Sequence, residues 1–443
     1  MSFDRVMKFG GAGLADGPAV QRACRIVAER GGERPIVVVS AHLGVTDLLD
    51  TVTRSALEGH LEADRVRIRH RTLLKQLALD PDLLDRYFTE LFGLLAEVRV
   101  RKRMLEGQHD HLLSFGERMS ARIVAHTLKS MGLHATPVDA WDLGITTDSN
   151  FGDARPLPNG TSNVRAALEQ VTGIPVITGF LAKDSLGNLT TMGRNGSDLT
   201  AALVAEAVGA GELQLWKAVG GMMTADPELV PDARVIERLG FQEAQEYAFH
   251  GAEVLYGPAL APVQRAGVTV RIMNVHAPDE PGTVLETTTR GEGPIGIATK
   301  PNVYRLDLAI GVADHRGPQA AELLNSLARY RVEPGVISSS GGRFSVIVTP
   351  GRGLDSVAAE LGRRIKIERD LAVIALIGRS LGDDTTLAQR CAELLSAARV
   401  EVIETFSGTR QPSLIFVVRQ SDLENAAKAL HRGLLRAPLS VRG

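Results

Sequence analysis

The sequence predicts an α/β fold in which a parallel-rich central sheet lies between helical layers and is followed by two small ferredoxin-like βαββαβ modules. Three observations lead to this expectation. A strand, a glycine turn, a helix and a second strand follow one another within the first 40 residues, which is the order of a parallel βαβ unit. Proline and glycine become frequent at residues 277–294, as in a linker. Beyond this stretch a strand–helix–strand–strand order occurs twice.

The chain begins with the apolar residues 6–9, which are typical of a buried strand and end at Gly10 and Gly11. A helix is expected at residues 18–29, because the proline at its first position loses no helical hydrogen bond there. The apolar run 35–40 has the length of a second strand. Together these segments predict the start of a parallel sheet.

The rest of the first 290 residues alternates between helical and strand-like segments. A long, mostly helical stretch occupies residues 47–132, and another helix is expected at residues 199–208. Further strands are expected at residues 135–138, 174–180, 214–216 and 268–272. We therefore expect residues 1–290 to form one α/β domain.

The last third of the chain repeats one order of elements. The first copy is expected to have strands at 306–312, 332–338 and 344–349 and a helix at 319–329. The second copy is expected to have strands at 373–377, 400–405 and 414–418 and helices at 386–398 and 421–435. We therefore expect two ferredoxin-like modules, at residues 295–370 and 371–443, which can exchange a strand.

Composition and charge exclude several classes of protein. A formal net charge of −2 gives no overall field that would attract nucleic acid or anionic lipid. Arginine is dense at residues 65–71, but no aromatic residues interleave, which indicates a solvated helix face rather than a nucleic-acid patch. The two cysteines cannot form a disulfide framework. No apolar run reaches the length of a membrane span and no signal peptide is recognisable, so we expect a cytoplasmic protein without nucleic-acid or membrane partners.

Two segments have the residue types of a phosphate site. Lys8, Gly10 and Gly11 end the first strand, where glycines let backbone N–H groups approach a phosphate and the lysine adds positive charge. The competing interpretation is an ordinary strand-to-helix turn. Residues 216–227 form a glycine-containing loop beyond a strand. Such a loop suits a nucleotide, or it is a plain connection that ends in an Asp-Pro turn.

Two further segments suit an amino acid. Residues 193–198 read Gly-Arg-Asn-Gly-Ser-Asp before a helix, and Arg194 has the side chain to grip a carboxylate with two hydrogen bonds. The competing interpretation makes Ser197 or Asp198 an ordinary helix N-cap. Glu117 follows a glycine in helical sequence, where it either binds an ammonium group or lies on the surface.

Taken in order, these segments resemble those of the aspartate kinases of the amino acid kinase superfamily, and the similarity covers essentially the whole chain. The ordered motifs are Lys-Phe-Gly-Gly at 8–11, Val-Val-Ser-Ala at 38–41, Ser-x-Gly-Glu at 114–117, Thr-Gly-Phe at 178–180, Gly-Arg-x-Gly-Ser-Asp at 193–198, Trp-Lys-x-Val-x-Gly at 216–221, Thr-Ala-Asp-Pro at 224–227 and Pro-Gly-Thr at 281–283. Each motif is weak alone, but the ordered set is specific. The resemblance implies the amino acid kinase fold, with catalysis in residues 1–290, and two ACT modules after them.

The resemblance also implies a reaction, in which the γ-phosphoryl group of ATP moves to the side-chain carboxylate of L-aspartate and Mg²⁺ accompanies the nucleotide. Lys8 would neutralise the transferring group, and Asp198 would organise the phosphate and metal region. Arg194 would hold the α-carboxylate of aspartate and Glu117 its ammonium group. The acceptor pocket would be completed by Ser40, Phe180 and Ser197. The nucleotide would contact Gly10, Gly11, Trp216, Lys217, Val219, Gly221, Met223 and Asp226.

For the ACT modules, the resemblance implies an amino-acid effector and contacts between subunits. Residues 314–318 follow a strand and precede a helix, where an effector would bind, or they form a plain turn in modules that serve only for dimerisation. We expect a homodimer or a higher homo-oligomer.

The chain departs from the family pattern mainly on the nucleotide side. Ala218 and Met223 replace a common aspartate and tyrosine, while Glu228 and Glu253 occupy positions that are often basic. Like charge near a polyphosphate is unfavourable unless a cation compensates, and Lys217 is a candidate for that cation. The further departures are Ala12, Gly13, Asn195 and Tyr256. Two alternatives therefore stay open: a catalytically weak regulatory homologue that binds amino acids, and a kinase for a related acidic acceptor.

Overall fold

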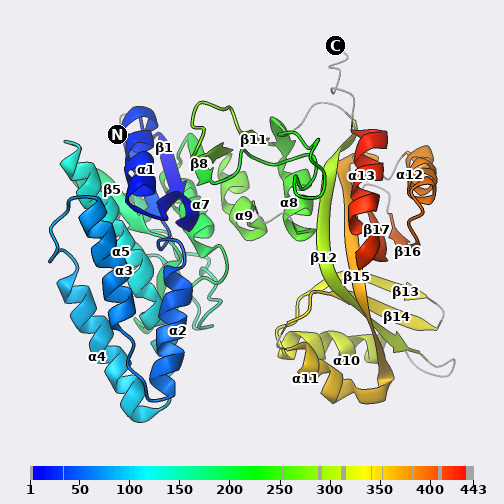
Figure 1. Cartoon of the computed structure of the whole chain (residues 1–443), viewed down its shortest axis with the longest axis horizontal. Coiled ribbons are helices and arrows are strands. Elements are labelled where there is room, and N and C mark those ends of the chain that lie inside the picture. The colour runs from blue at the N-terminus through cyan, green and yellow to red at the C-terminus, as the bar shows by residue number, and fades with distance from the viewer. Residues whose placement is uncertain are drawn as a thin grey trace. The chain divides into compact units, whose positions relative to one another are not determined.

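The computed structural model describes residues 3–32, 34–251, 254–287, 292–310, 316–340, 342–351, 353–381, 384–407 and 412–435. Internal contacts divide the chain into two compact units (Figure 1). The first unit consists of Met1–Met222, Glu237–Phe241 and Tyr256–Thr288, and the second of Met223–Ile236, Gln242–Leu255 and Thr289–Gly443. The expected domain boundary at residue 290 stays a prediction, and the contacts assign two shorter stretches before it to the second unit.

The first unit is built on an eight-stranded sheet in the order β3-β5-β2-β1-β8-β10-β11-β9. The strands are β1 (Arg5–Phe9), β2 (Pro35–Val39), β3 (Ala135–Val138), β5 (Ile174–Thr178), β8 (Glu212–Lys217), β9 (Arg238–Gly240), β10 (Thr269–Asn274) and β11 (Thr283–Glu286). All neighbours from β3 to β10 pair in parallel, and only the contact between β10 and β11 is antiparallel within the described sheet. The expected parallel-rich sheet is confirmed. The boundary between the two units, at residues 288 and 289, falls within the expected linker 277–294, but β11 joins the sheet inside that segment.

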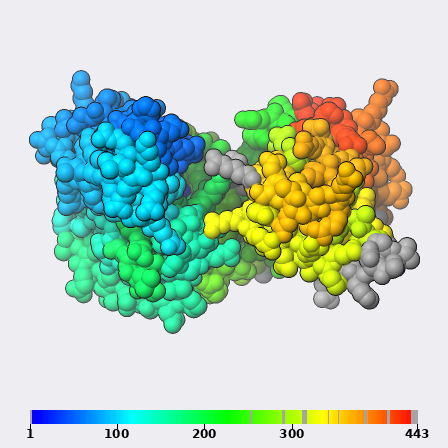
Figure 2. All heavy atoms as spheres, turned by 90° about the horizontal axis from the view of Figure 1, so that it is seen from below, coloured from blue at the N-terminus to red at the C-terminus, as the bar shows by residue number. Residues whose placement is uncertain are grey.

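Helices cover both faces of this sheet (Figure 1). On one face lie α1 (Gly17–Arg30) and α5 (Gln108–Ser130), with α2 (Val45–Leu57), α3 (Asp64–Gln76) and α4 (Asp85–Arg101) packed against them. The other face carries α7 (Gly196–Val208), flanked by α6 (Val164–Glu169) and α9 (Gly257–Ala266). Side chains of a strand alternate between the two faces, so Met7 and Phe9 join the core of α1 and α5 while Lys8 faces α7. Figure 2 shows the blue and cyan atoms of α1 to α5 gathered on one side of the first unit.

A small three-stranded sheet of β4 (Thr146–Thr147), β6 (Leu181–Asp184) and β7 (Leu189–Thr191) accompanies the main sheet. The sequence did not predict it, because its strands are only two to four residues long. The hairpin of β6 and β7 leads the chain from Phe180 to the loop before α7, and both of these line the cavity described below.

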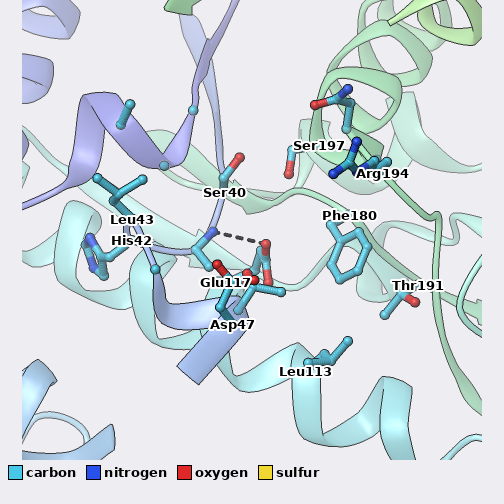
Figure 3. Close-up of a pocket in the computed structure, with 18 of the residues that line it drawn as sticks. Ser40, His42, Leu43, Asp47, Leu113, Glu117, Phe180, Thr191, Arg194 and Ser197 are labelled. Carbon is cyan, nitrogen blue, oxygen red and sulfur yellow. Dashed lines mark hydrogen bonds between the residues drawn. The ribbon is translucent and has the colours of Figure 1, made fainter. Parts of the chain in front are cut away.

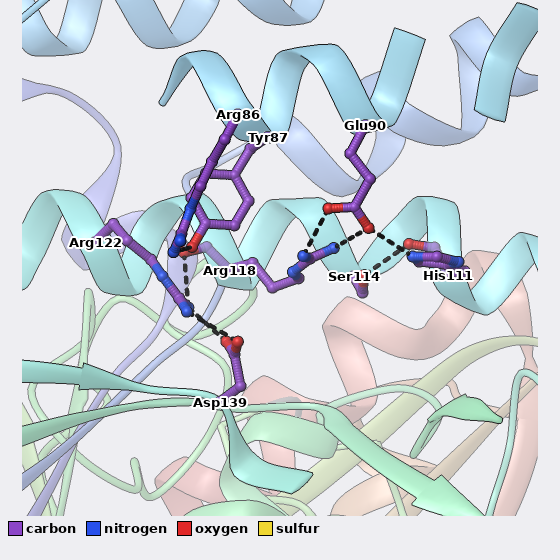
Figure 4. A network of polar contacts seen from close by, with 8 residues as sticks. All are labelled: Arg86, Tyr87, Glu90, His111, Ser114, Arg118, Arg122 and Asp139. Carbon is purple, nitrogen blue, oxygen red and sulfur yellow. Dashed lines mark hydrogen bonds and ion pairs between the residues drawn. The ribbon is translucent and has the colours of Figure 1, made fainter. Parts of the chain in front are cut away.

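Two charged pairs tie α5 to its neighbours, one buried and one at the surface (Figure 4). Arg122 on α5 forms two hydrogen bonds with Asp139, which follows β3, and one of them measures 2.8 Å. Arg118 on the same helix forms a second bidentate pair, with Glu90 on α4, through hydrogen bonds of 3.1 and 2.9 Å. Two-fold arginine–carboxylate pairs fix geometry as well as charge. They therefore hold α5 in place, which matters because α5 carries Glu117.

The second unit contains a six-stranded antiparallel sheet in the order β13-β14-β12-β15-β17-β16. Its central strands β12 (Gly293–Ala309) and β15 (Ile365–Arg379) are 17 and 15 residues long and pair along most of their length. The remaining elements are α8 (Phe241–Phe249), α10 (Arg316–Arg329), β13 (Pro334–Ser340), β14 (Arg343–Val348), α11 (Leu354–Leu361), α12 (Thr385–Ala397), β16 (Val402–Phe406), β17 (Ser413–Arg419) and α13 (Leu423–Leu434). Two hydrophobic cores lie along this sheet, one with α10 and α11 and one with α12 and α13. The expected ferredoxin-like repeat is confirmed.

None of the helices in the described part of the chain is long and apolar enough to cross a membrane.

Candidate active site

The carboxyl ends of four adjacent parallel strands, β5, β2, β1 and β8, meet at one edge of the first unit's sheet. The Ser40 N–H donates to the Phe9 carbonyl at 3.1 Å, and the Gly179 N–H donates to the Val39 carbonyl at 2.9 Å. The loops after these strands therefore lie side by side, and they border a cavity of about 600 Å³. Ligands of open α/β sheets bind at this edge. The predicted site residues that line the cavity are Lys8, Gly10, Gly11, Ser40, Glu117, Phe180, Arg194, Ser197, Trp216 and Lys217.

Asp198, in the first turn of α7, joins two lysines from neighbouring strands. The Nζ atom of Lys8 lies 2.6 Å from its Oδ1, and the Nζ atom of Lys217 donates to its Oδ2 at 2.6 Å. Lys8 and Asp198 are buried, whereas Lys217 keeps 15% of its side chain exposed. Because one carboxylate faces two ammonium groups, the cluster carries an excess of positive charge beside the cavity.

Burial disfavours the charged forms of Lys8 and Asp198, and the attraction between their opposite charges partly offsets this effect. Burial alone would raise the pKa of Asp198, but the charges and hydrogen bonds of Lys8 and Lys217 outweigh it and hold the pKa below its usual range. Burial lowers the pKa of Lys8, with help from the nearby Lys217 and against the attraction of Asp198. An anion in the cavity would favour the protonated form of Lys8. The cluster is therefore suited to receive the negative charge of a phosphoryl group.

Glu117 faces the cavity from α5 (Figure 3). Only 3% of the residue is exposed, so the interpretation as a surface glutamate is wrong. Its Oε1 accepts a hydrogen bond from the Ala41 N–H at 3.0 Å, while Oε2 is buried and has no hydrogen-bond partner among the described residues. Burial raises the pKa of Glu117 to about 7, although the Ala41 N–H and the charge of Lys8 oppose the shift. A buried carboxylate oxygen without a partner, beside a cavity, suits a cationic group of a ligand.

The loop before α7 has an unusual backbone. The N-cap of α7 is Asn195, in the left-handed conformation with φ +56°, so the interpretation of Ser197 or Asp198 as the N-cap is wrong. Glycine adopts this conformation freely and asparagine tolerates it better than most residues. This explains how Asn195 can stand at a position where glycine is usual. Ser197 and Asp198 are left free to direct their side chains to the cavity and to the lysines.

Phe180 also has a left-handed backbone, with φ +69°, which is rare for a bulky side chain. Two hydrogen bonds hold it: its N–H donates to Thr200 Oγ1 at 2.9 Å, and its carbonyl accepts from the Met192 N–H at 2.9 Å. The expected strand 174–180 therefore ends early, at Thr178, and Phe180 turns into the cavity (Figure 3). Strained residues persist where their surroundings fix them, as at binding sites.

The labelled side chains of Figure 3 divide the cavity by chemistry. Arg194 and Ser197 lie together near the start of α7, above Phe180 in this view, whereas Ser40, Glu117 and Asp47 lie to the left of Phe180. Arg194 is exposed, and its guanidinium group forms no ion pair or hydrogen bond with any of the described residues. The cavity thus offers a cation on one side and carboxylates on the other, as a zwitterionic ligand requires.

Four predicted nucleotide contacts do not line this cavity: Val219, Gly221, Met223 and Asp226. Val219 is 44% exposed, and Met223 and Asp226 belong to the second unit. Trp216 is fully buried and stacks on Phe9 with ring centroids 6.0 Å apart, so its indole is part of the core. Glu253 and the expected effector residues 314 and 315 lie outside the described residues.

Several lining residues were not singled out from the sequence, namely His42, Thr46, Asp47, His109 and Thr191. Thr46 and Asp47 belong to the first turn of α2, directly after Gly44 in the left-handed conformation. The sequence contains a signal for these two residues, because a glycine before a polar first helical turn resembles the Gly-Ser-Asp start of α7. His109 and Thr191 come from distant parts of the chain, and only the tertiary fold brings them to the cavity.

Comparison with known proteins adds an identity to this geometry. The chain belongs to the amino acid kinase family, whose sequence pattern matches residues 5–274. Over nearly its whole length it is similar to aspartokinases. It is 30% identical to the lysine-sensitive aspartokinase 3 of Escherichia coli strain K12, over 97% of this chain and 98% of that protein. It is 28% identical to the chloroplastic aspartokinase 1 of Arabidopsis thaliana, over 98% of this chain and 80% of that protein.

Solved structures agree with these relatives. The crystal structure of E. coli aspartokinase III in complex with aspartate and ADP, in its R-state, matches with a TM-score of 0.85 at 28% identity. The alignment covers 97% of this chain and 99% of that chain. The complex of the same enzyme with lysine and aspartate, in its T-state, matches with a TM-score of 0.80. The expected kinase fold and the family resemblance are therefore confirmed.

Proposed function

We propose that this chain is an aspartate kinase, which transfers the γ-phosphoryl group of ATP to the β-carboxylate of L-aspartate and forms 4-phospho-L-aspartate. The observation that carries the proposal is the presence, at one cavity, of the cluster of Lys8, Asp198 and Lys217 and of the unpartnered Oε2 of Glu117. The first suits a phosphoryl group and the second an ammonium group. The E. coli relative, whose complex contains aspartate and ADP, supports the same pair of ligands.

The acceptor would bind between the two sides of the cavity. The carboxylate of Glu117 would hold the ammonium group of aspartate, since its Oε2 has no described partner. The guanidinium group of Arg194 would grip the α-carboxylate, and the hydroxyl group of Ser197 would assist it. Ser40 and Phe180 would complete the walls. The side-chain carboxylate of aspartate would then point towards Lys8.

The chemistry needs no general base. The β-carboxylate of aspartate is already ionised at neutral pH. One of its oxygens attacks the γ-phosphorus, and the bond from that phosphorus to the bridging oxygen breaks, so that ADP leaves with the electron pair. Lys8 and Lys217 neutralise the charge that develops on the phosphoryl oxygens, and Asp198 keeps both ammonium groups in position.

The nucleotide would enter beside Gly10 and Gly11 and along Val219, Gly221, Met223 and Asp226, with Mg²⁺ bound to its phosphates. Among the described residues no three His, Cys, Asp or Glu side chains form a metal-binding group. Mg²⁺ in kinases is bound largely by substrate phosphates and water and needs few protein ligands, so the cation would arrive with the nucleotide. The ion would neutralise phosphate charge during transfer.

The second unit would regulate the enzyme. We infer ACT modules at residues 295–370 and 371–443 that bind an amino-acid effector and pair across a homodimer or higher homo-oligomer. The E. coli relative is named as lysine-sensitive, so lysine is the first effector to test. Because ATP and aspartate are abundant in the cytoplasm, we place the enzyme there.

The test is aspartate-dependent release of ADP from Mg-ATP by the full chain, with a panel of acceptor acids. Release with L-aspartate that disappears in Lys8→Ala supports the proposal. A stronger response to another acid would replace aspartate as the substrate. If no acid gives release and calorimetry detects no ATP binding, the chain is a regulatory homologue that binds amino acids.

A further inference from the structure

The backbone after the glycine turn is held by side chains from distant parts of the chain. The turn η1 (Gly11–Leu14) lines the cavity with its first three residues. Immediately beyond, the Leu14 carbonyl accepts a hydrogen bond from His42 Nδ1 at 2.7 Å. The next carbonyl, that of Ala15, accepts one from Arg69 Nη2 at 2.6 Å. Two consecutive carbonyls are therefore fixed from outside their own segment.

His42 connects two segments that line the cavity, namely the loop after β2 and the glycine turn. It belongs to the loop after β2, in which the Ala41 N–H holds Glu117 at 3.0 Å. The glycine turn approaches this loop so closely that a β-carbon at Gly11 would stand 3.0 Å from the Ala41 carbonyl oxygen. The bond from His42 to Leu14 is a second tie between the same two segments. One segment adjoins Lys8, and the other orients Glu117.

The imidazole ring of His42 is itself locked. Only 1% of the residue is exposed, and its ring meets that of His70 edge-on at 6.0 Å, while His70 meets Phe88 at 6.2 Å. The Leu14 carbonyl can only accept, so Nδ1 carries the proton and Nε2 does not. Nε2 is buried and has no hydrogen-bond partner among the described residues. The ring therefore has one orientation and one tautomer.

Arg69 differs from the other arginines of the basic stretch on α3. Arg65, Arg67 and Arg71 form ion pairs with Glu62, Asp64 and Asp85 at the surface. The expectation of a solvated basic face is therefore met by these three. Arg69 instead turns inward to the Ala15 carbonyl. The neighbouring His70 supports the ring of His42, so α3 reaches the glycine turn by two routes.

We propose that His42 and Arg69 are positioning residues for phosphoryl transfer, which fix the glycine turn relative to the loop that orients Glu117. This inference rests on the proposed function, because the turn is taken to face the donor and Glu117 the acceptor. Reacting groups must be held closely in register, and a displacement of about 1 Å can lower a rate about 100-fold. Both residues act through backbone carbonyls, His42 through that of Leu14 and Arg69 through that of Ala15.

The experiment compares matched variants of the full chain. His42→Leu keeps the volume and loses the donor, whereas His42→Asn keeps an N–H donor near the position of Nδ1. Arg69→Met loses the donor, and Arg65→Met is its control on the same helix, since within the described part of the chain the Arg65 side chain pairs only with Glu62, at 2.7 Å. We expect kcat to fall roughly 10- to 100-fold in His42→Leu and Arg69→Met, with KM for aspartate nearly unchanged. His42→Asn should recover most of the loss, and Arg65→Met should match the parent.

Hydrogen exchange of the amides of residues 11–17 separates this inference from the proposed function, because it needs no activity. Exchange should quicken at least about tenfold in His42→Leu and Arg69→Met, but not in Arg65→Met. If the parent chain has no kinase activity, these exchange rates alone decide the inference. Unchanged exchange, or equal loss of kcat in His42→Leu and His42→Asn, would overturn it.

Discussion

Gly179 lies against Ser197 so closely that a β-carbon at residue 179 would stand 2.5 Å from the Cβ of Ser197. Real β-carbons essentially never approach another atom within 3.0 Å, so a larger residue must move the backbone. This contact sets the end of β5 against the first turn of α7. Both Phe180 and Ser197 line the cavity, so the glycine determines the width of the cavity between them.

We therefore expect Gly179→Ala to damage both stability and substrate binding. The free energy of unfolding should fall by about 1–3 kcal/mol, because the small side chain overpacks a fixed contact. KM for aspartate should rise, because Phe180 and Ser197 are displaced. Urea unfolding and steady-state kinetics check both. Gly93→Ala is the control: this helical glycine has open space around it and should become neutral or slightly more stable.

Asp198→Asn tests the double lysine pair. Without the carboxylate, the ammonium groups of Lys8 and Lys217 repel each other, and Lys8 is buried. We expect a loss of about 3 kcal/mol in stability and of about 100-fold in kcat. Mg-ATP should raise the melting temperature of this variant more than that of the parent, since phosphates restore a counter-charge. Parent-like kcat in the variant would contradict the assigned role.

Glu117 should make aspartate binding depend on pH near neutrality. Burial raises its pKa to about 7, so the carboxylate is mostly protonated below that pH and ionised above it. An ammonium group binds the ionised form, so KM for aspartate should fall about tenfold between pH 6 and pH 8. Glu117→Gln should bind weakly at every pH and lose this dependence. A pH-independent KM in the parent would show that Glu117 does not contact the ammonium group.

The two histidines behind the glycine turn should make the first unit sensitive to acid. Burial lowers the pKa of His42 to about 3 and that of His70 to about 4, with added repulsion from nearby Arg69. Both values lie below that of an unfolded histidine, about 6.5, so the stability they contribute is complete above pH 6.5 and is lost as the pH falls towards their folded pKa values. From pH 7 to pH 5 each should cost about 2 kcal/mol.

Urea unfolding at these two pH values measures the effect. His70→Phe keeps an aromatic ring and removes one titrating group, so it should lose about half of the pH dependence. Its free energy of unfolding at pH 7 should stay close to that of the parent. If the free energy of unfolding falls equally in the parent and the variant between pH 7 and pH 5, His70 is not the source of the acid sensitivity.

The sequence predicted the strands whose ends border the cavity, and ten of the fifteen predicted site residues line it, because motifs at strand ends are local. It could not show the pairing of those residues. Lys217 was expected to offset acidic groups near the nucleotide, but the fold places its ammonium group on Asp198. Glu117 stands in helical sequence that does not distinguish a buried face from an exposed one.

The long central strands of the second unit were underestimated for a physical reason. Residues 300–302 read Lys-Pro-Asn, which favours a turn in isolation. In the structure β12 passes through them by shifting its register against β15 between Lys300 and Val303, with Asn302 at φ +54°. Tertiary pairing thus overrides a local turn signal.

The shared ladder of β12 and β15 has a consequence for dissecting the protein. Residues 293–300, at the start of β12, pair with residues 373–379 of β15, whereas the later residues 305–308 pair with residues 365–368. A stop codon near residue 370 would therefore leave the first eight residues of β12 without their partners on β15. A fragment that starts near residue 370 would in turn leave residues 373–379 of β15 without their partners on β12. We therefore expect neither repeat to fold alone, and the six-stranded sheet should unfold and tolerate truncation only as a single unit.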